Sequence, residues 1–82
     1  MDKYEKLRSE AIKKLQYLKK IYNEAYNDNS SIYYDNLDEI YLSIQDLSNA
    51  IITSEIYYKS SKSRKKAIKI LESALENSFF LI

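Results

Sequence analysis

Apolar residues recur along the first third of the chain at steps of three and four positions. They are Tyr4, Leu7, Ala11, Leu15, Leu18, Tyr22 and Ala25. This spacing places them on one face of an α-helix. The pattern stops at the polar run of residues 27–31, whose side chains compete with helical hydrogen bonds and favour turns and N-caps. We expect a first helix over about residues 2–27, with Ser30 or Ser31 capping the next one.

The middle of the chain carries the most regular apolar pattern. Steps of four and three alternate through Tyr33, Leu37, Ile40, Ile44, Leu47, Ile51, Ser54 and Tyr58. A sustained period of about 3.5 residues is typical of a helix that packs almost parallel or antiparallel to its neighbours. The pattern predicts a second helix over about residues 31–59.

The last part of the chain predicts a third helix over about residues 62–80. One face carries Ile68, Leu71, Leu75, Ser78 and Ile82, with Ala67 and Ala74 beside it. Continuing the apolar pattern of the second helix would instead select two charged residues, Lys65 and Glu72, so the helix breaks near residues 59–63. The alternative is one long helix over residues 32–80, which would need a dimer to bury its apolar face.

Composition favours a single all-α domain. The 82 residues suffice for one hydrophobic core, and they include no Gly, Pro, Cys, His or Trp. Tight hairpin turns need residues that tolerate positive φ, so the lack of glycine disfavours a sheet. We predict a three-helix antiparallel bundle over residues 1–82, with self-association left open.

Most catalytic sites need residue types that this chain lacks. Without His or Cys there is no Ser–His or Cys–His pair and no ordinary zinc site, and without Gly there is no phosphate-binding glycine loop. Asp35, Asp38, Glu39 and Asp46 offer carboxylates, but the side chains of one helix cannot surround an ion alone. We therefore expect no catalysis, no cofactor, no metal and no small-molecule substrate.

No stretch of the chain approaches the roughly 20 apolar residues that a membrane helix needs. The first residues also lack the apolar core of a signal peptide, so we expect a cytoplasmic protein. The apolar run at residues 79–82 is interpreted as the last core turn of the third helix.

Charge is segregated along the chain. The net charge is +4 over residues 1–20, −7 over residues 21–58 and +4 over residues 59–82. The densest basic segment consists of Lys59, Lys62, Arg64, Lys65, Lys66 and Lys69. It could contact phosphates, with Tyr57 and Tyr58 stacking on bases. The other interpretation is that two basic helices flank an acidic one, so that the charges complement each other within the fold.

Several apolar residues fall outside the predicted core faces. Leu42 and Ile56 lie two heptads apart opposite the apolar seam of the second helix, with Ile52 adjacent. Others are Ile12, Ile70 and Phe80. Exposed apolar patches commonly mark contact surfaces. Unless the second helix is central enough to bury these groups, we expect Leu42, Ile52 and Ile56 to contact a partner. The acidic neighbours expected to set partner choice are Asp38, Asp46 and Glu55.

These observations favour binding over chemistry. The first hypothesis is a small inhibitor, immunity or adaptor protein that occludes a protein partner. The alternative is a nucleic-acid-binding protein that uses residues 59–69, and a third is a homodimer through the same apolar residues. In size and helical build the chain is comparable to many small immunity, antidote and phage-encoded inhibitor proteins, which is a likeness of build alone.

Overall fold

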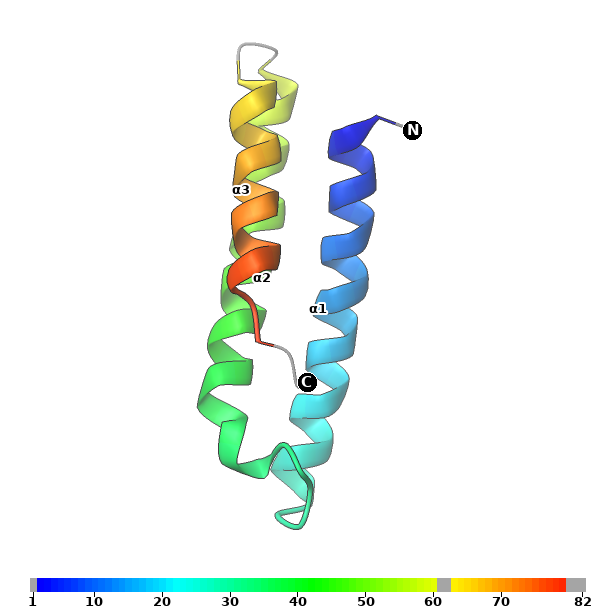
Figure 1. The fold of residues 1–82 in the computed structure, drawn as a ribbon, viewed down its shortest axis with the longest axis vertical. Helices are drawn as coiled ribbons and strands as arrows, with labels where there is room; N and C mark the ends of the chain where they lie inside the picture. The colour runs from blue at the N-terminus through cyan, green and yellow to red at the C-terminus, as the bar shows by residue number, and fades with distance from the viewer. Residues whose placement is uncertain (1, 61–62, 80–82) are drawn as a thin grey trace.

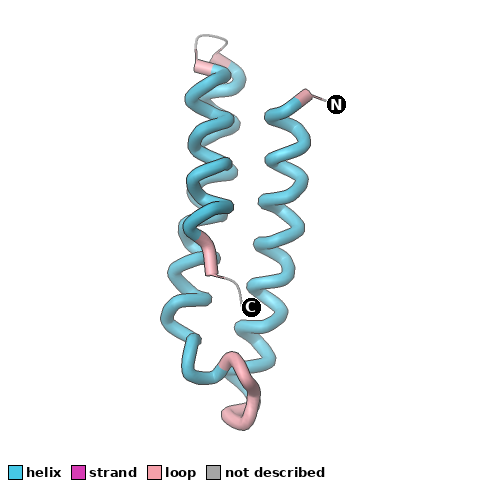
Figure 2. Tube along the Cα trace, viewed as in Figure 1, coloured by secondary structure: helices cyan, strands magenta, loops and turns pink. Residues whose placement is uncertain are grey.

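The computed structural model describes residues 2–60 and 63–79 and contains three α-helices within them (Figure 1). These are α1 (Lys3–Asn27), α2 (Leu37–Lys59) and α3 (Arg64–Asn77), with a 3₁₀ turn η1 (Tyr34–Asn36) before α2. In the view of Figure 1, α1 runs down, α2 up and α3 down along a rod of 47 × 21 × 18 Å. The described residues form no strand (Figure 2). The predicted all-α three-helix bundle is confirmed, and the single long helix over residues 32–80 is wrong.

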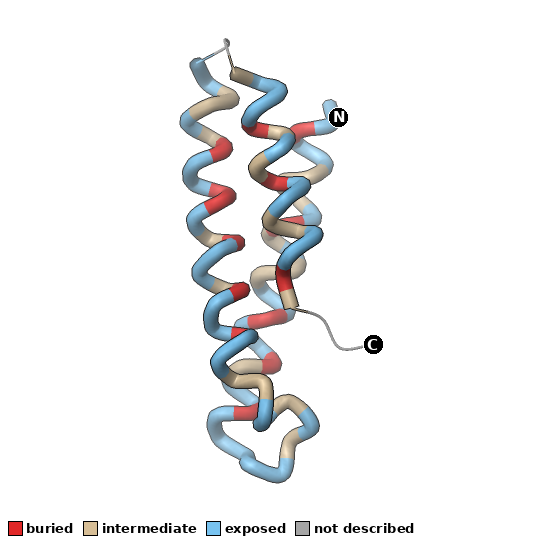
Figure 3. Tube along the Cα trace, turned by 60° about the vertical axis from the view of Figure 1, so that its left-hand side comes forward, coloured by how far each residue is buried: buried red, intermediate tan, exposed pale blue. Residues whose placement is uncertain are grey.

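The residues buried between the helices largely follow the predicted apolar seams. The fully buried apolar residues are Ala11, Leu18, Ala25, Ile40, Leu47, Ala67 and Leu71. They lie on the inward faces of the helices (Figure 3). Both α1 and α3 pack against α2, which also buries Ser43 and Ala50 beside its seam. The buried arc of α2 is therefore wider than its apolar seam alone.

The start of α2 differs from the prediction. The helix begins at Leu37 and not near residue 31, and neither Ser30 nor Ser31 caps it. Instead, Asp28 Oδ1 accepts hydrogen bonds from the Ser30 backbone N–H (3.0 Å) and hydroxyl (2.6 Å). Ser31 Oγ accepts one from the Tyr33 N–H at 3.2 Å. These local bonds stabilise a turn that competes with an earlier helix start.

The end of α3 also differs. The helix stops at Asn77 because Ser78 adopts an extended backbone with φ −77° and ψ 152°. Phe79 therefore lies beyond the helix, although it packs against the core as expected. Its backbone N–H donates to Ser43 Oγ of α2 at 2.7 Å. The predicted helix limits at residues 62 and 80 lie outside the described residues.

None of the three helices, as far as the structure describes them, is both long enough and apolar enough to span a membrane. The rod is also uneven along its length. Because α3 is shorter than its neighbours, it covers the half of the α1–α2 pair that holds the N-terminus (Figure 1). The half nearest the loop between α1 and α2 consists of two helices.

Candidate functional site

The outer face of α2 carries three large aliphatic side chains in solvent. Leu42, Ile52 and Ile56, here named the outer strip, are 58%, 61% and 66% exposed. Ile51 is the immediate neighbour of Ile52, yet it is only 9% exposed and belongs to the core. The expectation that the outer strip faces water in a single copy is confirmed.

Helical geometry explains why these residues gather on one face. Leu42 and Ile56 are separated by two heptads, which returns them to nearly the same side of the helix. Ile52 and Ile56 are four positions apart, so their side chains are neighbours on the helix surface. The residues between Leu42 and Ile52 on this side include Gln45 and Asn49, both uncharged and exposed. The strip thus has an apolar patch at one end, a single leucine at the other and a neutral polar centre.

The other apolar residues that fell outside the predicted seams behave differently. Ile12 and Ile70 are half-buried and pack against the core, so neither is a free surface residue. Each is next to a buried residue in the sequence, so its side chain reaches the edge of the core. Phe80 lies outside the described residues. Ile32, which the apolar pattern did not single out, is 71% exposed in the loop between α1 and α2.

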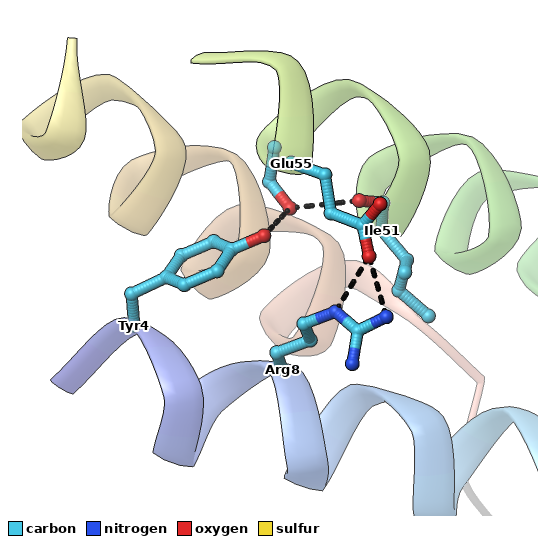
Figure 4. Close-up of polar contacts among 5 residues, drawn as sticks. Tyr4, Arg8, Ile51 and Glu55 are labelled. Carbon is cyan, nitrogen blue, oxygen red and sulfur yellow. Dashed lines mark hydrogen bonds and ion pairs between the residues drawn. The ribbon is translucent and has the colours of Figure 1, made fainter. Parts of the chain in front are cut away.

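The three acidic residues near the outer strip have unequal surroundings. Asp38 is exposed near the start of α2. Asp46 is exposed too and lines a shallow pocket with Lys66 and Lys69 of α3. Glu55 is instead engaged within the fold: its Oε1 forms an ion pair with Arg8 of α1, whose Nε donates at 2.8 Å (Figure 4). A role in partner choice remains a prediction for Asp38 and Asp46. The carboxylate of Glu55 is already used in the ion pair with Arg8.

Polar contacts on the inner side of α2 fix it to α1. The Tyr4 hydroxyl lies 3.0 Å from Ser54 Oγ, which also donates to the Ile51 carbonyl at 3.0 Å (Figure 4). Both Tyr4 and Ser54 are buried. No buried side-chain nitrogen or oxygen among the described residues lacks a hydrogen-bond partner. The helix that carries the outer strip is therefore anchored to α1 through its opposite side.

The tyrosines that were expected to stack on bases already have partners. Tyr58 stacks on Tyr4 with ring centroids 4.1 Å apart, and the Arg64 guanidinium lies 5.0 Å from its ring. The Tyr58 hydroxyl donates to Asp2 Oδ2 at 2.5 Å. This bond lowers the pKa of Asp2 below its ordinary value and raises the pKa of Tyr58. Tyr57 is half-buried, and Lys66 Nζ lies 4.4 Å from its ring. The base-stacking role is not supported by this arrangement.

The basic segment is exposed at one end of the rod, where α2 ends and α3 begins. Its described members are Lys59, Arg64, Lys65, Lys66 and Lys69, and Lys62 lies outside the described residues. None of these five forms an ion pair with another residue that the structure describes. They form a concentrated positive surface.

The described helices form few of the ion pairs that the expected charge complementarity would allow. Because α3 runs antiparallel to α2, its cations lie beside the end of α2, whereas Asp38 and Glu39 lie at the start. Among the described residues, the ion pairs between helices are Lys3–Glu72 at 3.4 Å and the Arg8–Glu55 pair. The rod is therefore acidic at the end with the α1–α2 loop and basic at the other.

A cluster of tyrosines occupies the two-helix half of the rod. Tyr22 packs against Tyr26 and Tyr41, with ring centroids 6.1 and 6.0 Å apart. The Tyr17 and Tyr33 hydroxyls lie 3.2 Å apart, and this bond raises the pKa of Tyr33. The sequence placed Tyr22 and Tyr33 on core faces but did not place Tyr17 or Tyr26. The spacing of four between Tyr22 and Tyr26 was the available signal.

The carboxylates considered as cation ligands do not form a metal site. Within residues 2–60 and 63–79, no group of three or more acidic side chains lies close enough together to hold a metal ion. Asp35, Asp38, Glu39 and Asp46 are exposed and spread along the start of α2 and the turn before it. They contribute negative charge to this end of the rod.

Comparison with protein-family models, with curated proteins and with solved structures found no match to this chain. The geometry of α2 and its neighbours is therefore the basis on which a function is proposed.

Proposed function

We propose that the chain is a small helical protein-binding module that acts without catalysis, as an inhibitor, immunity or adaptor protein that occludes a protein partner. The observation that carries the proposal is the outer strip. Three large aliphatic side chains share one face of a helix whose opposite face is fully used by the core. The size and build also suit a phage- or mobile-element-encoded protein of the cytoplasm, by likeness of build alone.

The energetics of apolar burial support this function. Moving a Leu or Ile side chain from water into an interface is favourable by roughly 1.5–3 kcal/mol when burial is complete. Exposed aliphatic residues scattered singly over a surface are ordinary. Ile52 and Ile56, however, are adjacent on one face and share it with Leu42. A partner that covers this face gains from all three at once.

The anchoring of α2 through its inner side also favours binding. Its inner side is fixed by buried core residues and by the Tyr4–Ser54 and Arg8–Glu55 contacts. A surface that is already ordered loses little conformational entropy when a partner binds. Asp38 and Asp46 border the strip and favour a partner with basic residues at the edge of its contact surface.

The test uses the tagged chain as bait in extracts of cells that produce it. Ile52→Asp places a charge in the strip and should abolish capture of the partner without loss of helicity. Ile32→Asp is the matched control, because it introduces the same charge at a similarly exposed isoleucine in the α1–α2 loop. We expect the control to capture the same partner as the unmodified chain. Equal capture by the Ile52→Asp variant would refute the proposal.

A second candidate function is nucleic-acid binding at the basic end. The observation that favours it is the group of five exposed cations without an ion-pair partner among the described residues. Phosphate contacts would make the affinity fall steeply with salt. The comparison is between Lys65→Gln/Lys69→Gln and a control, Lys19→Gln/Lys20→Gln, which removes the same charge from α1. A lack of binding to duplex DNA or RNA at low salt would exclude this function. Equal weakening of the binding by the two double variants would exclude it as well.

A further inference from the structure

We propose that the outer strip is covered by a second copy of the chain, which lies antiparallel across it with a two-fold axis at Asn49. The proposal rests on the proposed function in one respect: the strip must be a protein-binding surface. It adds that a second copy covers this surface in the isolated protein, and it gives the register of that contact. The two arguments for it are the symmetry of the strip and the distribution of charge along the rod.

The two ends of the strip are placed symmetrically about its centre. Leu42 and Ile56 each lie seven residues from Asn49, on opposite sides of it along α2. At a rise of about 1.5 Å per residue, each is about 10 Å from the centre. In a two-fold interface, a residue that contacts a second residue across the axis is matched by the reciprocal contact. With the two Asn49 residues opposite each other, Leu42 meets Ile56 of the second copy, and the reverse contact follows.

Charge selects the antiparallel arrangement over the parallel one. Asp38 and Glu39 lie near the start of α2, and Lys59 is its last residue. Because these charges are at opposite ends of one copy, they do not neutralise each other within it. An antiparallel second copy brings its Lys59 and basic end beside Asp38 and Glu39, whereas a parallel copy would align like charges.

The centre of the strip tolerates a symmetric contact. Gln45, Asn49 and Thr53 are exposed and uncharged, so no like charges meet directly at the axis. Asp46 is the nearest acidic side chain, three residues from the centre. Its two copies would lie about 9 Å apart along the helix axis, given the rise per residue. We therefore expect Asp46→Asn to strengthen the dimer a few-fold, an effect that shrinks at high salt.

The contact of one helix face with another is small. Interfaces below roughly 1,200 Å² are typical of weak and transient complexes, so we expect a dissociation constant in the micromolar range. Light scattering over a concentration series should show a monomer–dimer equilibrium. Ile56→Asp should shift it to monomer, and Ile32→Asp should leave it unchanged.

Cysteine cross-linking tests the register, because the chain contains no cysteine of its own. A disulfide needs Cα atoms roughly 4.4–6.8 Å apart. Asn49→Cys places the thiols at the axis, where the two copies should link under mild oxidation. Thr53→Cys is the matched control on the same helix, where the two thiols would be about 12 Å apart along the axis. At Lys59→Cys the separation grows to about 30 Å.

The expected result is a disulfide-linked dimer that forms at least about tenfold faster with Asn49→Cys than with the other two variants. Equal rates at all three positions would mean parallel pairing or random collision and would overturn the proposal. So would a chain that remains monomeric at every concentration with no excess linkage at position 49. Neither result would decide whether the strip binds another protein. The Ile52→Asp capture experiment tests that function separately.

Discussion

The two faces of α2 carry similar side chains in opposite environments. Ile51 and Leu47 are packed in the core, while Ile52 and Leu42 lie in solvent on the same helix. Apolar residues on the inner face contribute to folding because burial removes their surface from water. Those on the outer face keep most of their surface in water within one copy, so they gain little of this kind. The comparison shows that apolar content alone does not reveal what a helix packs against, whereas its angular position does.

The largest expected effect is the difference in unfolding free energy between two leucine variants. Leu47→Ala should destabilise the fold by about 2–5 kcal/mol, because it leaves a cavity in the core. Leu42→Ala removes the same atoms from the outer strip and should change stability by less than about 0.5 kcal/mol. Urea unfolding followed by circular dichroism measures both. Similar losses for the two variants would remove the distinction between the faces.

A second prediction concerns the polar contact on the inner face. Ser54→Ala leaves the buried Tyr4 hydroxyl without its partner and should cost about 1–3 kcal/mol. Tyr4→Phe should cost less, since Ser54 keeps its hydrogen bond to the Ile51 carbonyl. A double-mutant cycle from urea unfolding gives the coupling between the two residues. A coupling of zero would mean that Tyr4 and Ser54 do not act together in fixing α2 to α1.

The smallest expected effect is on the pH dependence of stability. The pKa of Asp2 is lowered by the hydrogen bond from Tyr58, so its contribution is present above the unfolded pKa of about 3.8 and is lost as the pH falls. The pKa of Tyr58 is raised by the same bond, so its contribution is present below the ordinary value of 10.0 and is lost as the pH rises through the raised pKa.

Melting temperatures across pH measure this effect. Asp2→Asn and Tyr58→Phe should each flatten the decrease on both sides, because one bond shifts both pKa values. An unchanged profile in both variants would show that the contact between the α1 N-cap and the end of α2 is not maintained in solution. Neither variant should alter the exposure of the outer strip, which lies outside this contact.

Sequence periodicity predicted the core but not the local departures from it. The seam from Ile40 to Ile51 and the exposure of the outer strip both follow from angular position on a helix. The late start of α2 did not follow, because Asp28 and Ser31 favour turn bonds over a cap. The pairing of Glu55 with Arg8 depends on the packing of α1 against α2, which spacing within one helix does not determine.

We expect the outer strip to contribute almost nothing to the stability of a single copy. The most direct test is the unfolding free energy of the Leu42→Ser/Ile52→Ser/Ile56→Ser variant, measured in urea at concentrations where the unmodified chain is monomeric. We predict a difference of less than about 1 kcal/mol from the unmodified chain, with an equal dependence on urea. A loss of about 3 kcal/mol or more would instead place these side chains in the core of the single copy.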